Sequence, residues 1–368
     1  MNEQASKRRR IVEPPQRQRQ DEGNHEQGLD SSALPPAANW YDRRQLLQNC
    51  FVGTGQGKLL RELVGVVDGY CGEEFGGSYE FTGHRYAVES VCALGGGRLA
   101  SGSLDQTIRI WDLHNGRDPK VLRGHTDAVH SICEIEDGRL LASSSHDETI
   151  RIWDMEKGGE CVHTLTGHRW NVWSVCALGN GLLASGADDE KIRIWDLNNG
   201  GRCLQTLTGH LDGVISFCVL SNGQLLASGS HDETIRIWDL NNGGRCLQTL
   251  TGHTGSVHSV CALSDGRIAS GSDDETVRIW DNKEGQYKPV QTLTGHSHSV
   301  KSVCALGDDG RLASGSYDNT IRIWDLNKGG ENVQTLTGHT DYGVNSVCAL
   351  GDGRLASGSG DKTIRVWF

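Results

Sequence analysis

The chain has 368 residues, enough for one large domain or two ordinary ones, and a formal net charge of -11. This acidic balance argues against direct binding to nucleic acid or to an anionic membrane, because both require clustered Lys and Arg. The first residues contain no apolar run suited to a signal peptide, and no stretch is long enough to span a membrane.

Residues 1–38 are polar and contain two Pro-Pro pairs, a composition that predicts a disordered tail. The run from Lys7 to Arg10 is a basic cluster typical of a nuclear-import signal or of a small patch for an acidic partner. Four basic residues are also common in a tail that is merely solvated, so all three interpretations stay open.

Residues 39–75 are predicted to form a short helical leader. Its second half places apolar residues on one helical face: Leu59, Leu60, Leu63, Val64 and Val67. Residues 51–58 differ from a phosphate-binding loop, since Val52 replaces the first Gly and Leu59 follows Lys58, so nucleotide binding is not predicted. The leader is interpreted either as a cap on the next domain or as a helix pair that docks a partner or self-associates.

Residues 76–368 consist of seven repeats with a period of 41 to 43 residues. Each repeat begins with Gly-His, and the seven His residues are His84, His125, His168, His210, His253, His296 and His339. A Trp follows each His after 27 or 28 residues: Trp111, Trp153, Trp195, Trp238, Trp280, Trp324 and Trp367. A fixed period of this length is the signature of a repeat architecture.

Each repeat predicts four short strands. In the fifth repeat these strands are expected at 257–263, 268–272, 276–280 and 290–294, with turns at 264–267 and around Asp274. The chain ends at Trp367-Phe368, directly after a third strand, so the last repeat has no fourth strand of its own. Residues 78–82 match the end of the fourth-strand pattern and are predicted to close the last repeat, which would cover an exposed sheet edge.

The Gly-His and Trp-Asp landmarks at this period resemble the WD40-repeat family over residues 78–368. The resemblance implies an all-β fold, a seven-bladed β-propeller with one repeat per blade. Fold alone does not name a function, since a propeller supports many functions.

The resemblance also implies a role for four polar groups that recur in every repeat. In this family the His, a Ser, an Asp and the Trp form a buried hydrogen-bonded tetrad that ties the strands of one blade together. Two of the expected tetrads are His84, Ser101, Asp105 and Trp111 in the first repeat and His210, Ser228, Asp232 and Trp238 in the fourth. Ser, His and Asp together invite comparison with a hydrolase triad, but seven identical copies favour structure over catalysis.

Cys and Arg also repeat. Seven of the twelve Cys occupy one position in seven different repeats, and the sequence contains no Cys-x-x-Cys, so neither disulfides nor a zinc site is predicted. Free Cys of this kind indicates a reducing, intracellular location, in the cytoplasm, the nucleus or both. An Arg two residues before each Trp is expected to pack between blades and to pair with a nearby Asp.

Function is expected where the repeats differ. In WD40 proteins the narrower top surface carries most peptide contacts, at the start of the first strand and just before the tight-turn Asp. Carried to this sequence, the predicted partner-binding residues are Glu89, His130, His146, Trp170, Trp173, Asp188, His231, His258, Asp273, Lys301 and Tyr317. Trp170 and Trp173 are expected to be exposed anchors, and Asp188 and Asp273 to receive a basic side chain from a partner.

The sequence thus predicts a non-catalytic scaffold that binds proteins or peptides, without cofactor, metal or direct nucleic-acid binding, and with a monomeric propeller. One alternative is a ubiquitin-ligase substrate receptor, because the stretch from Trp280 to Lys283 resembles the Trp-Asp-x-Arg/Lys ending of cullin-4 receptors. Another is a chromatin adaptor that reads histone tails, favoured by the acidic top residues and the basic cluster. An enzyme is the alternative of a different class.

Overall fold

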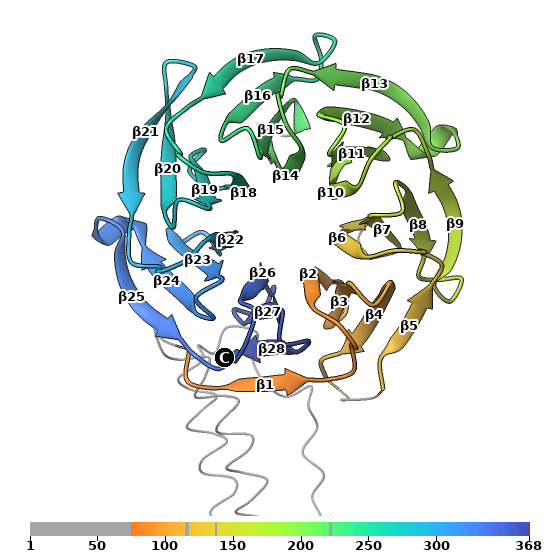
Figure 1. The fold of residues 1–368 in the computed structure, drawn as a ribbon, viewed down its shortest axis with the longest axis horizontal. Helices are drawn as coiled ribbons and strands as arrows, with labels where there is room; N and C mark the ends of the chain where they lie inside the picture. The colour runs from red at the N-terminus through yellow and green to blue at the C-terminus, as the bar shows by residue number, and fades with distance from the viewer. Residues whose placement is uncertain (1–74, 115–117, 137, 221–222) are drawn as a thin grey trace, which may run out of the picture. The chain divides into compact units, whose positions relative to one another are not determined.

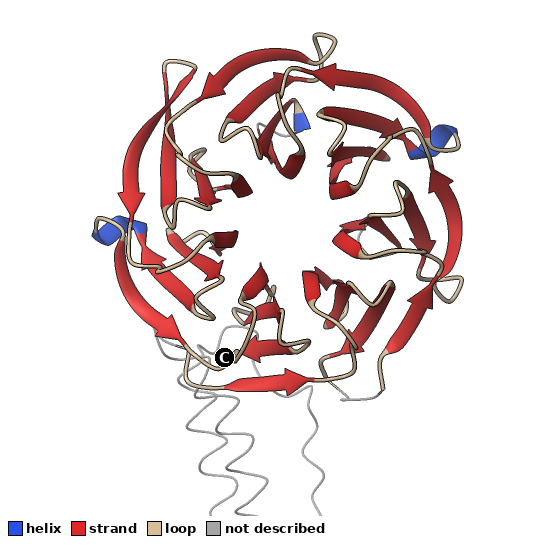
Figure 2. Ribbon diagram, viewed as in Figure 1, coloured by secondary structure: helices blue, strands red, loops and turns tan. Residues whose placement is uncertain are grey.

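The computed structural model describes residues 75–114, 118–136, 138–220 and 223–368. The predicted tail at 1–38 and the predicted leader at 39–75, apart from Phe75, lie outside the described residues. The described residues form a ring of seven four-stranded antiparallel sheets, the predicted seven-bladed propeller (Figure 1). Strand and loop dominate, with only short helical turns (Figure 2).

Six blades are each built from four consecutive strands. Blades 1 and 2 contain β2 (Val88–Leu94), β3 (Arg98–Ser103), β4 (Thr107–Asp112) and β5 (Lys120–Arg123), then β6 (Val129–Ile135), β7 (Leu140–Ser145), β8 (Ile150–Asp154) and β9 (Glu160–Leu165). Blades 3 and 4 contain β10 (Val172–Gly179), β11 (Leu182–Ala187), β12 (Lys191–Asp196) and β13 (Arg202–Thr208), then β14 (Val214–Leu220), β15 (Leu225–Ser230), β16 (Ile235–Asp239) and β17 (Arg245–Leu250). Blades 5 and 6 contain β18 (Val257–Ala262), β19 (Ile268–Ser272), β20 (Val277–Lys283) and β21 (Gln286–Leu293), then β22 (Val300–Leu306), β23 (Arg311–Ser316), β24 (Ile321–Asp325) and β25 (Glu331–Leu336).

The seventh blade joins the two ends of the propeller. It contains β26 (Val344–Ala349), β27 (Leu355–Ser359), β28 (Ile364–Trp367) and, as its outermost strand, β1 (Ser78–Phe81). Ser78 pairs with Trp367 and Phe81 with Ile364, so the predicted closing strand is confirmed. The short 3-10 helices η1 (Leu197–Asn199) and η3 (Leu326–Lys328) follow the third strands of blades 3 and 6.

A side-chain clamp strengthens this closure. The amide of Gln334, on the outer strand of blade 6, both accepts from the backbone N–H of Phe75 and donates to its carbonyl, each at 2.7 Å. Gln248 holds Tyr287 of the next blade in the same two-way manner, at 2.9 and 2.7 Å. The N-terminal segment therefore repeats the contact that joins ordinary neighbouring blades.

The core lies between the blades rather than within them. Ile192 and Leu207 of blade 3, for example, pack with Val214, Leu226 and Trp238 of blade 4, all buried. Apolar residues of all four strands supply these inter-blade layers, and the second strands are buried along almost their whole length. Each Trp thus contributes its large apolar area to the contact with the preceding blade.

The innermost strands are also linked to one another around the ring axis. A Ser hydroxyl near the start of one first strand accepts the backbone N–H of the next blade, as in Ser90 with Ile132 at 3.2 Å and Ser216 with Val260 at 3.0 Å. Ser346 accepts from Val91 at 3.1 Å and so spans the seam between blades 7 and 1. These bonds link the first strands, which lie nearest the centre of the ring (Figure 1).

The repeated Cys residues are free thiols in the described part of the chain. Neighbouring copies are nevertheless near each other, since the N–H of Ala93 in blade 1 points at the Cys348 sulfur of blade 7 at 3.2 Å. Burial raises the pKa of Cys176 to about 12 and that of Cys348 to about 11. These thiols stay protonated at neutral pH, which makes them poor nucleophiles and poor metal ligands.

The expected pairing of the repeated Arg with a nearby Asp is wrong for most blades. Within the described residues, Arg278 lies 4.0 Å from Asp274, and Arg365 pairs instead with Glu80 of the closing strand. The buried Nε atom of each of the seven Arg has no hydrogen-bond partner in the described residues. Their guanidinium groups instead pack near the turn Gly of their own repeat, where a Cβ on Gly83 would lie 2.9 Å from Arg109.

Candidate functional site

The structure brings the four tetrad groups together in every blade. In blade 4 the Nδ1 atom of His210 lies 2.8 Å from the Asp232 carboxylate, and its Nε2 atom lies 2.7 Å from the Ser228 hydroxyl. The Trp238 indole N–H donates to the same hydroxyl at 2.8 Å. Blade 1 repeats these distances at 2.9, 2.7 and 2.8 Å. The chain of hydrogen bonds therefore runs from the top turn, through the second strand, to the third.

Every polar group of a tetrad has a partner. Asp232 also accepts from the backbone N–H groups of Leu211 and Thr234, each at 3.0 Å. Burial raises the pKa of Asp232, but the hydrogen bonds from His210, Thr234 and Leu211 outweigh it and hold the pKa well below the usual range. Ser228 is 0% exposed, so no substrate reaches its hydroxyl in the folded ring. The arrangement serves as a clamp.

The top of the propeller is the side that carries the loops before each first strand and the turns between second and third strands. Around its centre lies a set that we call the axial collar, formed by the second residue of each first strand. Its members are Glu89, His130, Trp173, Ile215, His258, Lys301 and Asn345. All seven are partly exposed.

Contacts between neighbouring blades join three pairs of residues in the axial collar. The Asn345 amide donates to Glu89 at 3.2 Å, across the seam between blades 7 and 1. The rings of His130 and Trp173 lie 4.4 Å apart, and the Lys301 ammonium lies 2.8 Å from Nε2 of His258. Residues separated by a whole repeat thus form one surface.

A second set surrounds the axial collar and consists of the residue before each tetrad Asp. We call these the turn positions: Leu104, His146, Asp188, His231, Asp273, Tyr317 and Gly360. Their backbone N–H groups donate to the loop before the first strand of the same blade, as in Leu104 to Ala87 and Tyr317 to Ser299, both at 3.0 Å. Because the backbone is fixed in this way, the side chains alone differ from blade to blade.

Blades 2 to 5 form an aromatic chain on this surface. The His146 ring lies 3.9 Å from that of His130 and 5.0 Å from that of Trp173. The His231 ring then connects Trp173, at 6.0 Å, with His258, at 5.8 Å. Five residues that were predicted separately as partner contacts are therefore one connected cluster.

Blades 5 and 6 form a charged cluster beside it. Asp273 lies 2.7 Å from Nε2 of His258 and 3.5 Å from the Lys301 ammonium, which also lies 4.5 Å above the Tyr317 ring. Burial raises the pKa of Asp273, but the hydrogen bond from His258 and the charges of His258 and Lys301 outweigh it and hold the pKa well below its usual range. The three groups thus satisfy one another.

Two expectations about this surface need correction. Trp173 is only partly exposed, and its indole N–H donates to Asp188 at 2.5 Å, whereas Trp170 is 62% exposed. Asp188 and Asp273, which were expected to await a basic side chain, are already engaged by Trp173 and by His258 with Lys301. These pairings could not be predicted from the sequence, because they depend on side-chain conformation and, for Lys301 with Asp273, on contact between neighbouring blades.

The part of the axial collar in blades 7, 1 and 2 is different. Burial raises the pKa of Glu89 to about 7, partly offset by the positive charge of Lys301. Burial and the neighbouring His146 lower the pKa of His130 to about 3, so its ring is neutral. Three buried atoms here lack a hydrogen-bond partner among the described residues: Asn345 Oδ1, His130 Nε2 and His146 Nε2.

The repeat family described as "WD domain, G-beta repeat" matches the chain seven times, at residues 77–112, 116–154, 159–196, 201–239, 244–281, 287–325 and 330–367. The chain belongs to the WD40-repeat family. Each matched stretch is offset from a blade by one strand: it begins with the outer strand of the preceding blade and ends with the third strand of its own, as in 116–154, which holds β5 and then β6, β7 and β8.

Curated relatives are similar over one or two repeats only. THO complex subunit 3 of Arabidopsis thaliana is 44% identical over 61 residues, 15% of this chain and 19% of that protein. Human coronin-7 is 42% identical over 65 residues, 16% of this chain and 7% of that protein. The E3 ubiquitin-protein ligase COP1 of Arabidopsis thaliana is 43% identical over 47 residues, 13% of this chain and 7% of that protein. The chain therefore matches less than a fifth of the length of these relatives.

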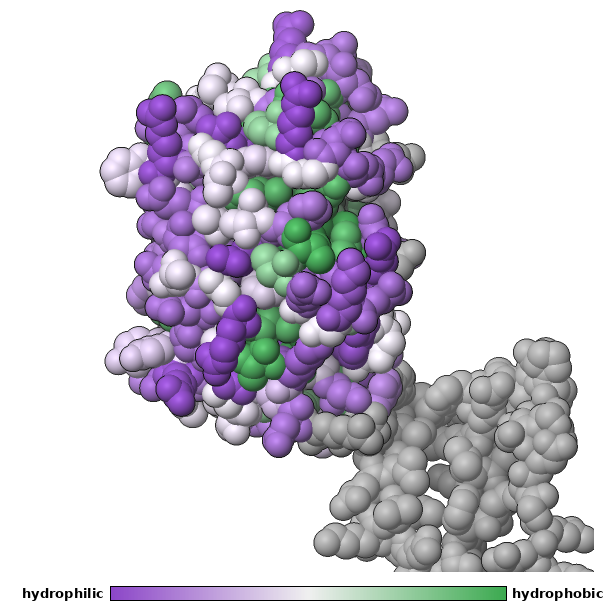
Figure 3. Space-filling view, turned by 90° about the vertical axis from the view of Figure 1, so that its right-hand side faces the viewer, coloured by the Kyte–Doolittle hydropathy of each residue, from purple (hydrophilic) through white to green (hydrophobic). Residues whose placement is uncertain are grey.

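Exposed apolar side chains of this WD40 protein gather on the top. Six of the ten large ones lie in the top loops and turns: Tyr86, Leu104, Trp170, Leu211, Tyr317 and Tyr342. Leu211 is 79% exposed and Tyr342 75%. The other four lie on outer strands of the rim, where Figure 3 shows apolar patches separated by hydrophilic side chains. Exposed apolar area of this kind marks interaction surfaces.

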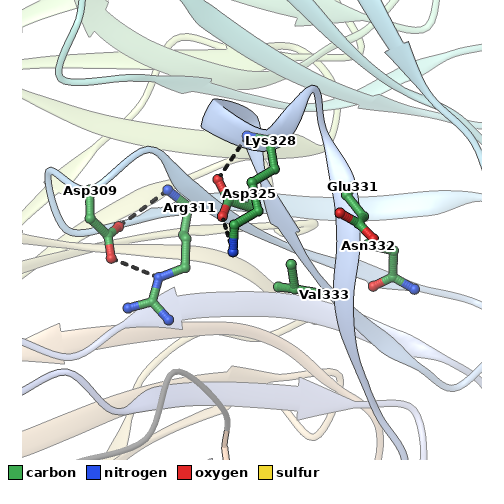
Figure 4. A pocket seen from close by; sticks show the side chains of 7 residues that line it. All are labelled: Asp309, Arg311, Asp325, Lys328, Glu331, Asn332 and Val333. Atoms are coloured by element: carbon green, nitrogen blue, oxygen red, sulfur yellow. Dashed lines mark hydrogen bonds and ion pairs between the residues drawn. The ribbon is translucent and has the colours of Figure 1, made fainter.

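The underside of the WD40 ring, opposite the top, has cavities in which several charged side chains are already paired. A cavity of 420 Å³ in blade 6 is lined by charged residues, but Arg311 pairs with Asp309 at 2.7 Å and Lys328 with Asp325 at 3.3 Å (Figure 4). A cavity of 530 Å³ lies between blades 4 and 5. Its Tyr287 hydroxyl donates to the Gly266 carbonyl at 3.4 Å. These local pairs stabilise turns and leave little charge for a ligand.

The described residues offer no metal centre, since no group of three or more His, Cys, Asp or Glu among them is placed to hold an ion. They also include no helix long and apolar enough to cross a membrane.

Proposed function

We propose that this WD40 protein is a scaffold that binds protein segments through its top surface. The observation that carries the proposal is the concentration of exposed apolar side chains in the top loops, around an axial collar that has six residue types at its seven positions. Burying one such aromatic side chain contributes about 1.5–3 kcal/mol to a complex, so a few of them suffice for recognition. The underside, by contrast, is composed largely of turns with local ion pairs.

The names of the relatives are consistent with this role. One similar protein is a subunit of the THO complex and another is a ubiquitin ligase. WD40 proteins generally mediate protein interactions, so assembly into a multiprotein complex is the function that the family favours for this chain.

Site-specific crosslinking tests the proposal. Benzoylphenylalanine in place of Trp170 or Leu211, both exposed top residues, should capture a direct partner from cells of the source under ultraviolet light. The matched control places the same crosslinker at the exposed Asn199 on the underside. Bands seen at both top positions and missing at residue 199, identified by mass spectrometry, support the proposal. Bands that appear only from residue 199 contradict it.

A substrate receptor of a cullin-type ubiquitin ligase is a second candidate. The stretch that resembles the cullin-4 receptor ending lies on the longest hairpin of the propeller, β20–β21, and Lys283 is exposed near its tip. Lys283 pairs only weakly within the chain, at 3.6 Å from Asp281. If the candidate is right, Lys283→Glu should abolish co-purification of the ligase, while Lys288→Glu on the same hairpin should not.

A third candidate function is that of a chromatin adaptor, a scaffold of the same kind that acts in the nucleus. It would receive a basic tail on the top, where acidic residues recur in the loops before the first strands: Asp127, Asp212 and Asp341. Binding of an unmodified histone tail peptide, tested against its scrambled form, would favour it.

A further inference from the structure

The axial collar has one half that is satisfied and one that is not. In blades 5 and 6, His258, Asp273 and Lys301 are joined to one another at 2.7 to 3.5 Å. In blades 7 and 1, Asn345 donates to Glu89 and to the Val88 carbonyl, but nothing described donates to the Asn345 oxygen. A ligand that donates hydrogen bonds would therefore gain the most binding free energy in blades 7 and 1, where an acceptor has no partner.

The groups left without partners there can all accept hydrogen bonds. Asn345 Oδ1 is an acceptor only, and Glu89 keeps acceptor capacity beyond the single bond from Asn345. A neutral imidazole accepts at the nitrogen that carries no proton, and Nε2 of His130, which has no partner, is this acceptor in the tautomer that holds its proton on Nδ1. These three residues occupy the same repeat position in consecutive blades, so their side chains share one level around the axis.

The charges around Glu89 also favour a ligand that carries a positive charge. Within the described residues, no cation lies within ion-pair distance of Glu89, and the nearest basic group that acts on it, Lys301, is held by Asp273. A buried carboxylate without a cation is costly, and the cost falls when a donor-rich cation arrives. An unpaired buried acceptor similarly costs about 1–3 kcal/mol until a donor meets it.

We propose that Asn345, Glu89 and His130 form a socket for a cationic side chain, an Arg guanidinium or a Lys ammonium, from the segment bound on the top. This inference rests on the proposed function and adds the chemistry of the partner. Guanidinium is the better fit because its five N–H donors lie in one plane and can meet acceptors from three blades at once. The unpartnered atoms are shielded, so rotation of these partly exposed side chains accompanies entry.

The aromatic chain supplies a wall for the same ligand. The Trp173 ring lies 4.4 Å from that of His130, and a cation held by His130 would approach the indole face. The indole N–H is already committed to Asp188, which fixes the ring orientation. The wall is therefore preorganised before the ligand arrives.

Three acetylated, amidated tripeptides test the socket: Gly-Arg-Gly, Gly-Lys-Gly and Gly-citrulline-Gly. Citrulline has nearly the shape of Arg without its charge. Binding to the full chain would be measured by ligand-observed NMR and by titration of the Trp173 indole N–H signal. We expect the Arg peptide to bind in the millimolar range or tighter, the Lys peptide more weakly, and the citrulline peptide at least about tenfold more weakly than Arg.

Matched variants localise the binding. Glu89→Gln should weaken the Arg peptide about tenfold, because it removes the charge and keeps the shape. Glu148→Gln is the control: Glu148 is an exposed acid on a top turn, where blade 1 already carries Gln106 with the same left-handed backbone. Equal melting temperatures would show that both variants fold.

The outcomes separate this inference from the proposed function. Lack of Arg binding, equal binding of citrulline, or equal losses from Glu89→Gln and Glu148→Gln would each overturn the socket. If crosslinks from residues 170 and 211 still identified a partner, the scaffold function would stand without the socket. Loss of those crosslinks as well would remove both.

Discussion

The tetrads and the axial collar lie within a few residues of each other, yet they follow opposite rules. Each tetrad uses the same four residue types, and each polar atom in it has a partner, as in His210 between Asp232 and Ser228. The axial collar uses six residue types at seven positions, and some of its buried polar atoms have no partner. Repetition here marks what holds the ring, and variation marks what the ring can bind.

The difference has a physical origin. A buried polar network stabilises only if it is complete, so it tolerates no change from blade to blade. The axial collar is partly exposed, and it is surrounded by the turn positions, whose backbone is already fixed by hydrogen bonds, as at Leu104 and Tyr317. Its side chains can therefore vary without loss of the fold, at a cost that a ligand can offset.

Deletion of residues 1–83 should have the largest effect, because it removes the strand that closes the ring. Both the tetrads and the axial collar depend on the closed ring. Without β1, the outer edge of β28 is open and the clamp between Phe75 and Gln334 is lost. We expect the cooperative thermal transition, followed by circular dichroism, to disappear. Deletion of 1–38 should leave it unchanged. A shortened chain that melts as sharply and as high as the full one would contradict the closed ring.

Asp232→Ala should break a tetrad and lower the free energy of unfolding by about 1–3 kcal/mol. It leaves the buried His210 and two backbone N–H groups without a hydrogen-bond acceptor. The counterpart in the axial collar, Glu89→Gln, should leave stability equal or raise it, because a buried charge is removed. Urea unfolding of both variants measures the contrast. Equal losses would mean that the axial collar, too, is structural.

The fold was predictable from the sequence because the same pattern of strands and turns occurs in all seven repeats. The second strand of blade 5 was predicted at its observed bounds, Ile268–Ser272, and the closing strand within one residue. The outer hairpin of that blade was underestimated: β20 runs to Lys283 and β21 starts at Gln286. Its extra pairs come from residues with no counterpart in the repeat pattern, so periodicity could not reveal them.

The sequence could predict which residues lie at the candidate site, but it could not predict how their side chains contact one another. The family resemblance placed His130, Trp173 and His258 on the top, but it could not show that their rings connect across blades through His146 and His231. Such contacts join residues from different strands and turns, several of them in neighbouring blades, and they depend on ring geometry rather than on any local pattern. Whether these residues bind a partner stays a prediction.

Acid should change the protonation of the axial collar before it reaches the tetrads, through two groups of opposite sign: the lowered pKa of His130 costs stability as pH falls from 7 to 5, whereas the raised pKa of Glu89 adds stability over the same range. The pKa of His130 is about 3 when folded and near 6.5 when unfolded, so below pH 6.5 the unfolded chain binds more protons and stability falls as pH falls. Between pH 7 and pH 5 this amounts to about 2 kcal/mol. His130→Asn, the residue that blade 7 carries, should remove that share of the pH slope in urea unfolding. The tetrad Asp232 has a lowered pKa, so its contribution is present above its ordinary pKa near 3.9 and is lost only below it.

An unchanged pH slope in His130→Asn would show that the ring is not kept neutral by its surroundings. His146 shares the site at 3.9 Å and its pKa is also lowered by burial, so His146→Asn should reduce the slope in the same direction.

Trp173→Phe should have a smaller effect. It keeps most of the aromatic contact with His130 but removes the N–H that Asp188 accepts at 2.5 Å. We expect a loss of about 0.5–1.5 kcal/mol in the free energy of unfolding. Trp170→Phe, in the same loop, is the control and should cost nothing measurable. The opposite ranking would mean that Trp170 is the packed residue of the pair.

Trp170→Ala should change stability least and binding most. The Trp170 side chain is 62% exposed, and no ring contact or hydrogen bond of its indole is found among the described residues. Removal of such a surface side chain changes the free energy of unfolding by about 0.5 kcal/mol or less. Its apolar area, however, lies in the loop before blade 3, and Leu211, which is 79% exposed, lies in the corresponding loop before blade 4, so a partner that covers both would lose an anchor. Partners captured through the crosslinker at residue 211 should therefore fall several-fold in Trp170→Ala, with the melting temperature unchanged. Full capture would place the binding surface on the opposite arc of the top, at Tyr86, Tyr317 and Tyr342.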